Sequence, residues 1–184
     1  MEKIGHGSLG PAFRAKVLPI GGIRVLKCFS GRLAVDEDLM DRFRREIRAA
    51  SAVRHTNAVH VESLERAADG RPFIVMDYAQ GLTLRELLIR GSFIPALDVV
   101  EIMGQICAAL DRAHGQGIVH QNLKPENVII AEEQEGIAHV NVMEFGMANL
   151  RQAATERGKQ VGDVLITDQG PVAGTLEYMS PEQA

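Results

Sequence analysis

A glycine-rich segment near the start of the chain limits the folds that can follow it. Gly5-His6-Gly7-Ser8-Leu9-Gly10 has the spacing G-x-G-x-x-G, which in a dinucleotide-binding fold must lead directly into a helix. Residues 11–18 instead have the composition of a strand, and Gly21-Gly22 turns the chain into another strand over residues 23–29. The segment is therefore predicted to join strands 3–7 and 11–18 of an antiparallel meander, and a Rossmann-type fold is excluded.

The rest of the first 78 residues continues this sheet and adds one helix. Apolar residues recur at helical spacing over residues 36–54, which predicts a helix with acidic residues in its first turn. Two more strands, 58–66 and 72–78, flank Asp69-Gly70, a strong hairpin signal. A sheet of five strands with a single helix is expected.

After Gln80-Gly81 the pattern becomes helical. Thr83 and Glu86 form a capping-box pattern that predicts a short helix, and Pro95 begins a long helix that ends at the turn over residues 115–117. Brief strands are predicted at 118–119, 128–130 and 139–143, and residues 146–184 are predicted to form mainly a long loop. The fold class is therefore α+β.

Composition excludes several classes of function. The 184 residues are 46% hydrophobic and 24% charged, with a net charge of −4, which is typical of a globular protein without a basic surface for nucleic acid. No apolar run is long enough to span a membrane, and the N-terminus lacks a secretory pattern, so a cytoplasmic location is expected. Cys28 and Cys107 are expected to be reduced, buried thiols.

Six segments in one order make the chain resemble the protein kinase family, in particular the eukaryotic-type Ser/Thr kinases of bacteria. They are residues 5–10 (G-H-G-S-L-G), 24–27 (R-V-L-K), 42–46 (R-F-R-R-E), 120–127 (H-Q-N-L-K-P-E-N), 144–146 (E-F-G) and 174–182 (G-T-L-E-Y-M-S-P-E). The resemblance implies a kinase-like N-lobe over residues 1–78 and a partial, mainly helical C-lobe over 79–184. It also implies ATP and Mg²⁺ as cofactors and a protein as substrate or partner.

The resemblance also implies roles for single residues, although Lys27 and Glu46, taken singly, would be ordinary surface charges. Lys27 would pair with Glu46 and hold the nucleotide phosphates, and Met76 would be the gatekeeper beside the adenine. The remaining implied nucleotide contacts are the glycine loop (Gly5, Gly7, Gly10), the backbone of Asp77 and Ala79, a roof of Ala12 and Val25, and a floor of Ile129. Lys124 would belong to the catalytic loop, and Asn127 and Glu144 would hold the metal.

Three of these positions differ from the family pattern. The H-R-D of the family is His120-Gln121-Asn122 here, so an amide replaces the carboxylate that accepts the substrate's proton, a role worth about 10²- to 10⁴-fold in rate. The D-F-G is Glu144-Phe145-Gly146, which lengthens the metal-binding arm by one methylene and should weaken Mg²⁺ binding. Gln121 cannot form the charge-assisted pair with a phosphorylated loop that an Arg would form.

The chain also matches only part of the family's second lobe. We therefore expect a large exposed apolar face on the long helix, around Val99, Ile102, Met103, Ile106 and Leu110, which could dock on a protein. The leading hypothesis is a nucleotide-binding, catalytically impaired, pseudokinase-like domain that acts through protein interaction. The alternatives are a weakly active Ser/Thr kinase and a truncated remnant without function.

Overall fold

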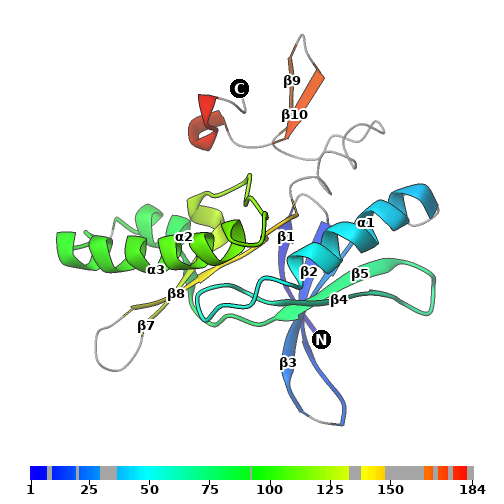
Figure 1. Ribbon diagram of the computed structural model, residues 1–184. Coiled ribbons are helices and arrows are strands. Elements are labelled where there is room, and N and C mark those ends of the chain that lie inside the picture. Colours follow the sequence, from blue (N-terminus) through cyan, green and yellow to red (C-terminus); the bar gives the residue numbers. More distant parts are fainter. Residues whose placement is uncertain are drawn as a thin grey trace.

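The structure is a computed structural model, which describes residues 1–7, 10–19, 21–29, 37–91, 93–132, 138–147, 164–167, 170–173 and 176–181. A five-stranded antiparallel sheet with one helix stands beside a smaller unit of helices and short strands (Figure 1). The sheet has the order β1-β2-β3-β5-β4. Its strands are β1 (Glu2–Gly7), β2 (Gly10–Lys16), β3 (Ile23–Cys28), β4 (Val61–Arg66) and β5 (Pro72–Asp77). These strands and α1 (Glu37–Ala50), called the first lobe below, confirm the predicted strands and helix.

Helix α1 packs on the sheet through the spacing seen in the sequence. Its buried residues are Met40, Phe43, Ile47 and Ala50, at intervals of three and four. The rings of Phe29 and Phe43 stack with their centroids 4.9 Å apart, between β3 and the helix. The helix ends at Ala50, four residues before the predicted end, because the chain turns there. The turn buries Val53 in a separate core, which belongs to the later helices and strands, called the second lobe below.

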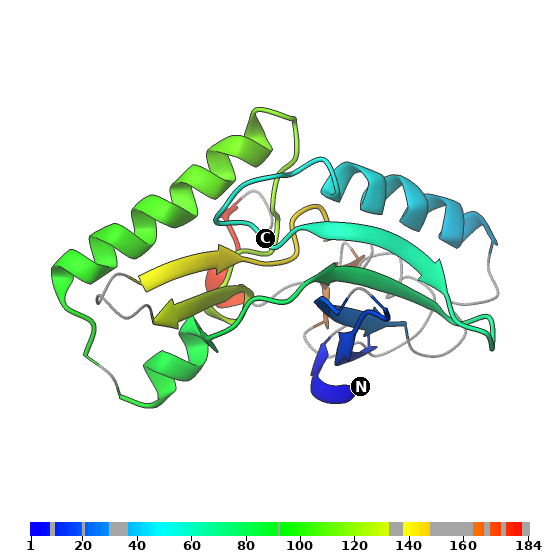
Figure 2. The same cartoon turned by 90° about the horizontal axis from the view of Figure 1, so that it is seen from below.

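The second lobe consists of two helices on a three-stranded sheet. Helix α2 (Leu84–Ile89) begins with the predicted capping box, in which Thr83 and Glu86 each accept a hydrogen bond from the other's backbone N–H. The bond from the Thr83 N–H lowers the pKa of the Glu86 carboxyl. Helix α3 (Ala96–His114) lies along β7 (Val128–Glu132) and β8 (Ala138–Val142), as Figure 2 shows. The short β6 (Leu82–Thr83), which was not predicted, completes the sheet order β6-β7-β8.

One further sequence prediction fails here, and a second one gains detail. The strand predicted at residues 118–119 is absent, because the Ile118 N–H bonds back to the Ala113 carbonyl at 3.0 Å and closes the end of α3. The loop predicted from residue 146 onward contains an antiparallel pair, β9 (Val164–Thr167) and β10 (Gly170–Ala173), and the short helical turn η3 (Leu176–Tyr178). The glycine-loop residues 8 and 9 and the segment 148–163 lie outside the described residues.

The two lobes are joined by the segment between α1 and β4. The Val59 N–H donates to the Val142 carbonyl at 2.9 Å, and the Val142 N–H donates to the Asn57 carbonyl at 2.8 Å. The Asn57 side chain donates to the Val140 carbonyl at 2.8 Å and to Gln105 Oε1 at 2.7 Å. This segment therefore pairs with β8 of the second lobe, and β4 begins at Val61 instead of the predicted residue 58.

Gly81 is the tightest point of the connection between the lobes. Its φ is +139°, and a Cβ placed there would lie 2.3 Å from the Ile130 carbonyl oxygen. Gly81→Ala is therefore expected to lower the free energy of unfolding by about 2–4 kcal/mol, measured by urea denaturation. Gly104→Ala is the matched control, since a Cβ there meets nothing within 4 Å and should raise helix stability. Equal effects of the two changes would contradict the steric argument.

The exposed apolar face expected on α3 is confirmed in part. Val99 and Met103 are exposed, with 42% and 49% of their surface accessible, whereas Ile102 and Ile106 are buried against β8. Leu110 is half-buried. Cys107 is exposed and Cys28 half-buried, so the prediction of two buried thiols is wrong: Cys107 lies on the side of α3 that no described element covers. No helix in the described ranges is long and apolar enough to cross a membrane.

Candidate nucleotide and phosphotransfer site

The register of the first sheet brings together several residues of the predicted nucleotide site. Ala12 on β2 stands opposite Lys27 on β3, and Val25 on β3 stands opposite Met76 on β5. Val25 and Lys27 are two residues apart, so their side chains leave the same face of the sheet. Met76 is buried in the core that α1 covers, and Val25 packs against the same core. The predicted roof residues and Lys27 therefore share one side of the first lobe.

Lys27 is buried and forms an ion pair with Glu144. The Lys27 ammonium donates a hydrogen bond to Glu144 Oε1, and only 9% of each side chain is accessible. The two residues are 117 positions apart and come from different lobes. A buried ammonium and a buried carboxylate compensate part of each other's lost hydration when they pair. Glu144 also has a positive φ of 68°, which turns its side chain out of the line of β8.

The loop before β7 is fixed to the segment that carries Glu144. His120 is buried and bonds through Nε2 to the Met143 carbonyl at 2.8 Å, and its ring meets Phe145 edge to face at 4.9 Å. The Met143 N–H in turn donates to the Asn127 carbonyl at 2.8 Å. His120 is therefore a packed structural residue of this loop. The loop and the Glu144 segment thus form one connected unit.

Asn122 and Asn127 are held within this unit. Asn127 is buried and uses its side-chain N–H to donate to the Asn122 carbonyl at 2.8 Å. The Asn122 N–H donates to His120 Nδ1 at 3.3 Å. The side-chain nitrogen of Asn122 is buried and has no hydrogen-bond partner among the described residues, which is a rare state for an amide donor. The preceding residue, Gln121, has a positive φ of 59° and is exposed.

The residues predicted to contact adenine lie where the chain passes between the lobes. Asp77 ends β5, and Ala79 follows in the connection, both half-buried. Ile129, the predicted floor, is half-buried on β7 and pairs with Thr83 of β6, directly after Gly81. Gly81 approaches the same strand, so the close contact described above sets the distance between the connection and Ile129.

The other predicted site residues are placed as follows. Gly5 and Gly7 lie on β1 and Gly10 begins β2, with Gly7 paired to Gly10 across the turn. Glu46 is half-buried on α1, and Lys124 is half-buried before the short helix η2 (Pro125–Asn127). The Lys27–Glu46 pair stays a prediction. The Lys27–Glu144 pair was not predicted from the sequence. The one sequence signal for it was Glu at the D-F-G position, because its side chain is one methylene longer than that of Asp.

Comparison with known proteins agrees with this arrangement. The family described as "Protein kinase domain" matches residues 1–184. The serine/threonine-protein kinase Pkn3 of Myxococcus xanthus is 39% identical over 98% of this chain and 32% of its own length. PknL of Mycobacterium tuberculosis is 35% identical over 98% of this chain and 42% of its own length. The chain therefore spans less than half the length of these relatives.

A solved structure of a kinase domain is also similar to this chain. The kinase domain of Mycobacterium tuberculosis PknI superposes with a TM-score of 0.64 at 26% sequence identity, over 79% of this chain and 57% of that one. The sheet order, the loop before β7 and the matched sequence all agree, and the chain belongs to the protein kinase family.

Proposed function

We propose that the chain binds ATP between its lobes and transfers phosphate to protein slowly or not at all. The observation that carries this proposal is the buried Lys27–Glu144 pair, beside a catalytic loop whose acceptor position is Asn122. The pair brings a phosphate-binding cation and a metal-binding carboxylate to one place. The amide at position 122 removes the group that would accept the proton of the substrate hydroxyl.

The residues present fit a Mg²⁺ ion bound together with nucleotide phosphates. Asn127 uses its amide nitrogen on Asn122, which leaves its side-chain oxygen as the group able to bind a cation. Glu144 supplies a carboxylate, and Mg²⁺ is commonly held by one or two protein oxygens together with substrate phosphates. When bound, the ion would neutralise charge on the phosphates. Lys27 occupies one oxygen of Glu144, Oε1, so the ion pair competes with the metal for this carboxylate.

Impairment follows from the chemistry of Asn122 within an otherwise ordered loop. A carboxamide has no useful basicity near neutral pH, whereas a carboxylate in its place would accept the hydroxyl proton. The buried side-chain nitrogen of Asn122 is still able to donate a hydrogen bond to a substrate oxygen. Substrate could therefore be held without its proton being removed.

The second candidate is a weakly active Ser/Thr kinase. It is favoured by the hydrogen bonds that join Asn122, Asn127 and Met143 into one unit, because phosphoryl transfer depends mainly on positioning and electrostatics. An interaction role with a protein partner accompanies the first candidate, and the exposed apolar residues of α3 support it. A remnant without function would bind no nucleotide, and the next experiment distinguishes it from both.

Thermal unfolding with ATP tests the proposal. With ATP at 100 times its dissociation constant, a bound nucleotide adds about 2.7 kcal/mol, which raises Tm by about 5–10 °C for a chain of this size. We expect this shift to be larger with Mg²⁺ than with EDTA. Inorganic tripolyphosphate, which lacks adenine, is the control and should give a smaller shift. An unchanged Tm with ATP under both conditions would exclude a nucleotide site.

A further inference from the structure

A cavity of about 580 Å³ lies where the first lobe, the connection after β5 and the second lobe meet. Its walls come from the start of β3, from the segment between α1 and β4, from residues 77–80, and from β7 and β8. It therefore contacts both lobes and the chain that joins them. Among its described lining residues, Arg24 alone comes from one of the six segments that identify the family.

The cavity shares Asp77 and Ala79 with the predicted nucleotide contacts but lies on the other face of the first sheet. Side chains alternate between the two faces of a strand, so Arg24 on β3 leaves the sheet on the face opposite to Val25 and Lys27. Arg24 lines the cavity and bonds to Glu62 Oε2 at 2.7 Å, whereas Lys27 bonds to Glu144. A molecule in the cavity would therefore lie across the sheet from the Lys27–Glu144 pair.

The side chains around the cavity favour an anion. Arg54, His55, His60 and His139 all line it, and Asp77 is the one carboxylate among the described lining residues. Asp77 already lies 3.6 Å from the Arg24 guanidinium, so its charge is compensated. Arg54 has no hydrogen bond or ion pair with any residue of the described ranges. His60 Nδ1 is buried and also has no hydrogen-bond partner there.

The size and the other walls favour an organic molecule over a bare ion. A volume of about 580 Å³ is within the range of small-molecule sites, which span about 300–1,000 Å³. Apolar surface from Ile23, Val59 and Ala131 lies beside the hydrogen-bonding groups of Tyr78 and Asn141. The described residues contain no group of three His, Cys, Asp or Glu able to hold a metal ion.

The geometry points to a binding site for a small organic anion, a carboxylate or a phosphate ester, in the cavity formed by Arg54, His60 and His139 behind the connection between the lobes. Arg54, whose side chain is exposed, would pair with the anionic group. The site contacts residues 77–80, which also form the predicted adenine edge, so an occupant would hold the two lobes at a fixed spacing. This site goes beyond the proposed nucleotide function and is independent of it.

Phenyl phosphate and benzoate serve as the two anionic probes, with neutral benzamide as the uncharged control. We expect saturable binding of an anionic probe to the nucleotide-free 184-residue chain by isothermal titration calorimetry, and no saturable binding of benzamide. Comparing phosphate with carboxylate shows which anionic group the site prefers. Ring NMR signals of His60 and His139 should shift with the same dissociation constant.

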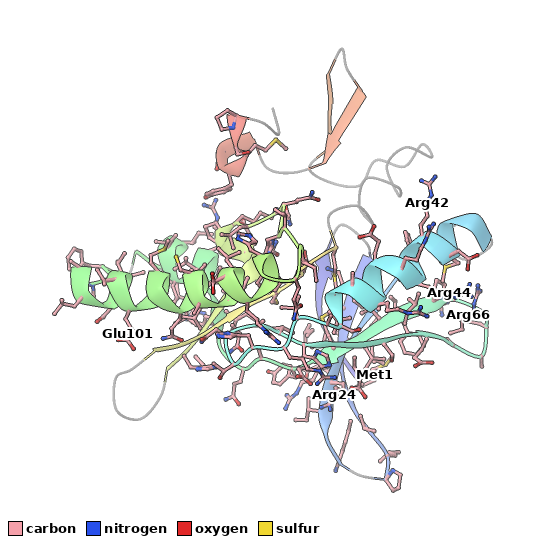
Figure 3. All side chains as sticks on the ribbon, in the orientation of Figure 1. Met1, Arg24, Arg42, Arg44, Arg66 and Glu101 are labelled. Carbon is pink, nitrogen blue, oxygen red and sulfur yellow. The ribbon has the colours of Figure 1, made fainter. Side chains whose placement is uncertain are left out.

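Three variants locate the binding. Arg54→Gln should weaken binding about tenfold or more, because a hydrogen bond to a charged group contributes about 1.5–3 kcal/mol. Arg42→Gln, which makes the same charge change on α1 on the side of the first lobe away from Arg24, should leave binding unchanged (Figure 3). Ala131→Leu keeps every charge and fills part of the cavity, so it should also weaken binding.

Lys27→Met separates this site from the nucleotide site. Binding of the anionic probe should persist in this variant, whereas ATP binding should be lost. The experiment therefore tests the anion site and the nucleotide site separately. Equal losses of probe affinity in Arg54→Gln and Arg42→Gln would overturn the site, as would loss of probe binding in Lys27→Met. Absence of saturable binding by both anions would overturn it as well.

Discussion

Changing Asn122 to Asp is expected to raise the rate of ATP-dependent phosphorylation of a peptide by about 10²- to 10⁴-fold. The change keeps the size of the side chain and replaces the buried amide nitrogen, which has no partner within the described part of the chain, with a carboxylate oxygen. The backbone contacts of position 122, to His120 and Asn127, do not involve the changed atoms. The new carboxylate would therefore stand in a loop that is already ordered. Transfer of radiolabelled phosphate from ATP to a serine peptide measures the gain.

Asn122→Ala is the matched control, because it removes the amide without adding a base and should give no gain. A gain of similar size in both variants would mean that the amide obstructs substrate, and would contradict the general-base argument. If Asn122→Asp binds ATP but shows no gain, the impairment lies elsewhere, with the longer side chain of Glu144 as the next candidate. Adding Glu144→Asp to the first variant tests that candidate directly.

Breaking the buried ion pair is expected to have the largest effect on stability. Lys27→Met removes the ammonium that pairs with the buried Glu144 carboxylate, and should lower the free energy of unfolding by about 3–5 kcal/mol. Glu144→Gln should have a similar effect because it leaves the ammonium uncompensated. The double variant should lose much less than the sum of the two, since no uncompensated charge remains. Urea denaturation of the four proteins without nucleotide gives the coupling energy.

Glu46→Gln is the control for this cycle, because the family resemblance assigns Glu46 as the partner of Lys27. If Glu46 carries that role in the nucleotide-free chain, Glu46→Gln will couple to Lys27→Met as strongly as Glu144→Gln does. Additive losses for Lys27 and Glu144 would show that the buried pair contributes nothing specific. Strong coupling confined to Glu144 supports the competition between Lys27 and the metal.

The first lobe could be predicted almost entirely from local sequence signals. Alternating strands, the Asp69-Gly70 turn and the helical spacing of Met40, Phe43 and Ile47 each indicate their own element, and sheet and helix then bury a common core. The capping box at Thr83 is equally local and is confirmed. Where the interacting residues are close in sequence, the local residue pattern is enough to predict the element.

Features that depend on distant residues were harder to predict. Lys27 and Glu144 come from different lobes, and nothing near either of them in sequence identifies the other. Residues 58 and 59 have strand composition but pair with Val142 of β8 instead of extending β4. The Ile118-Val119 segment is apolar like a strand, yet it closes a helix. In each case tertiary contacts outweigh the local preference.

The hydrogen bonds of Asn57 and Val59 to β8 have a consequence for motion. They attach the C-terminal end of α1 to the second lobe, while the opposite end of the helix has no such attachment among the described residues. If the lobes rotate relative to each other, this attachment acts as the pivot. Glu46 lies near the pivot, one helical turn before Ala50, so rotation would displace it less than the start of the helix at Glu37.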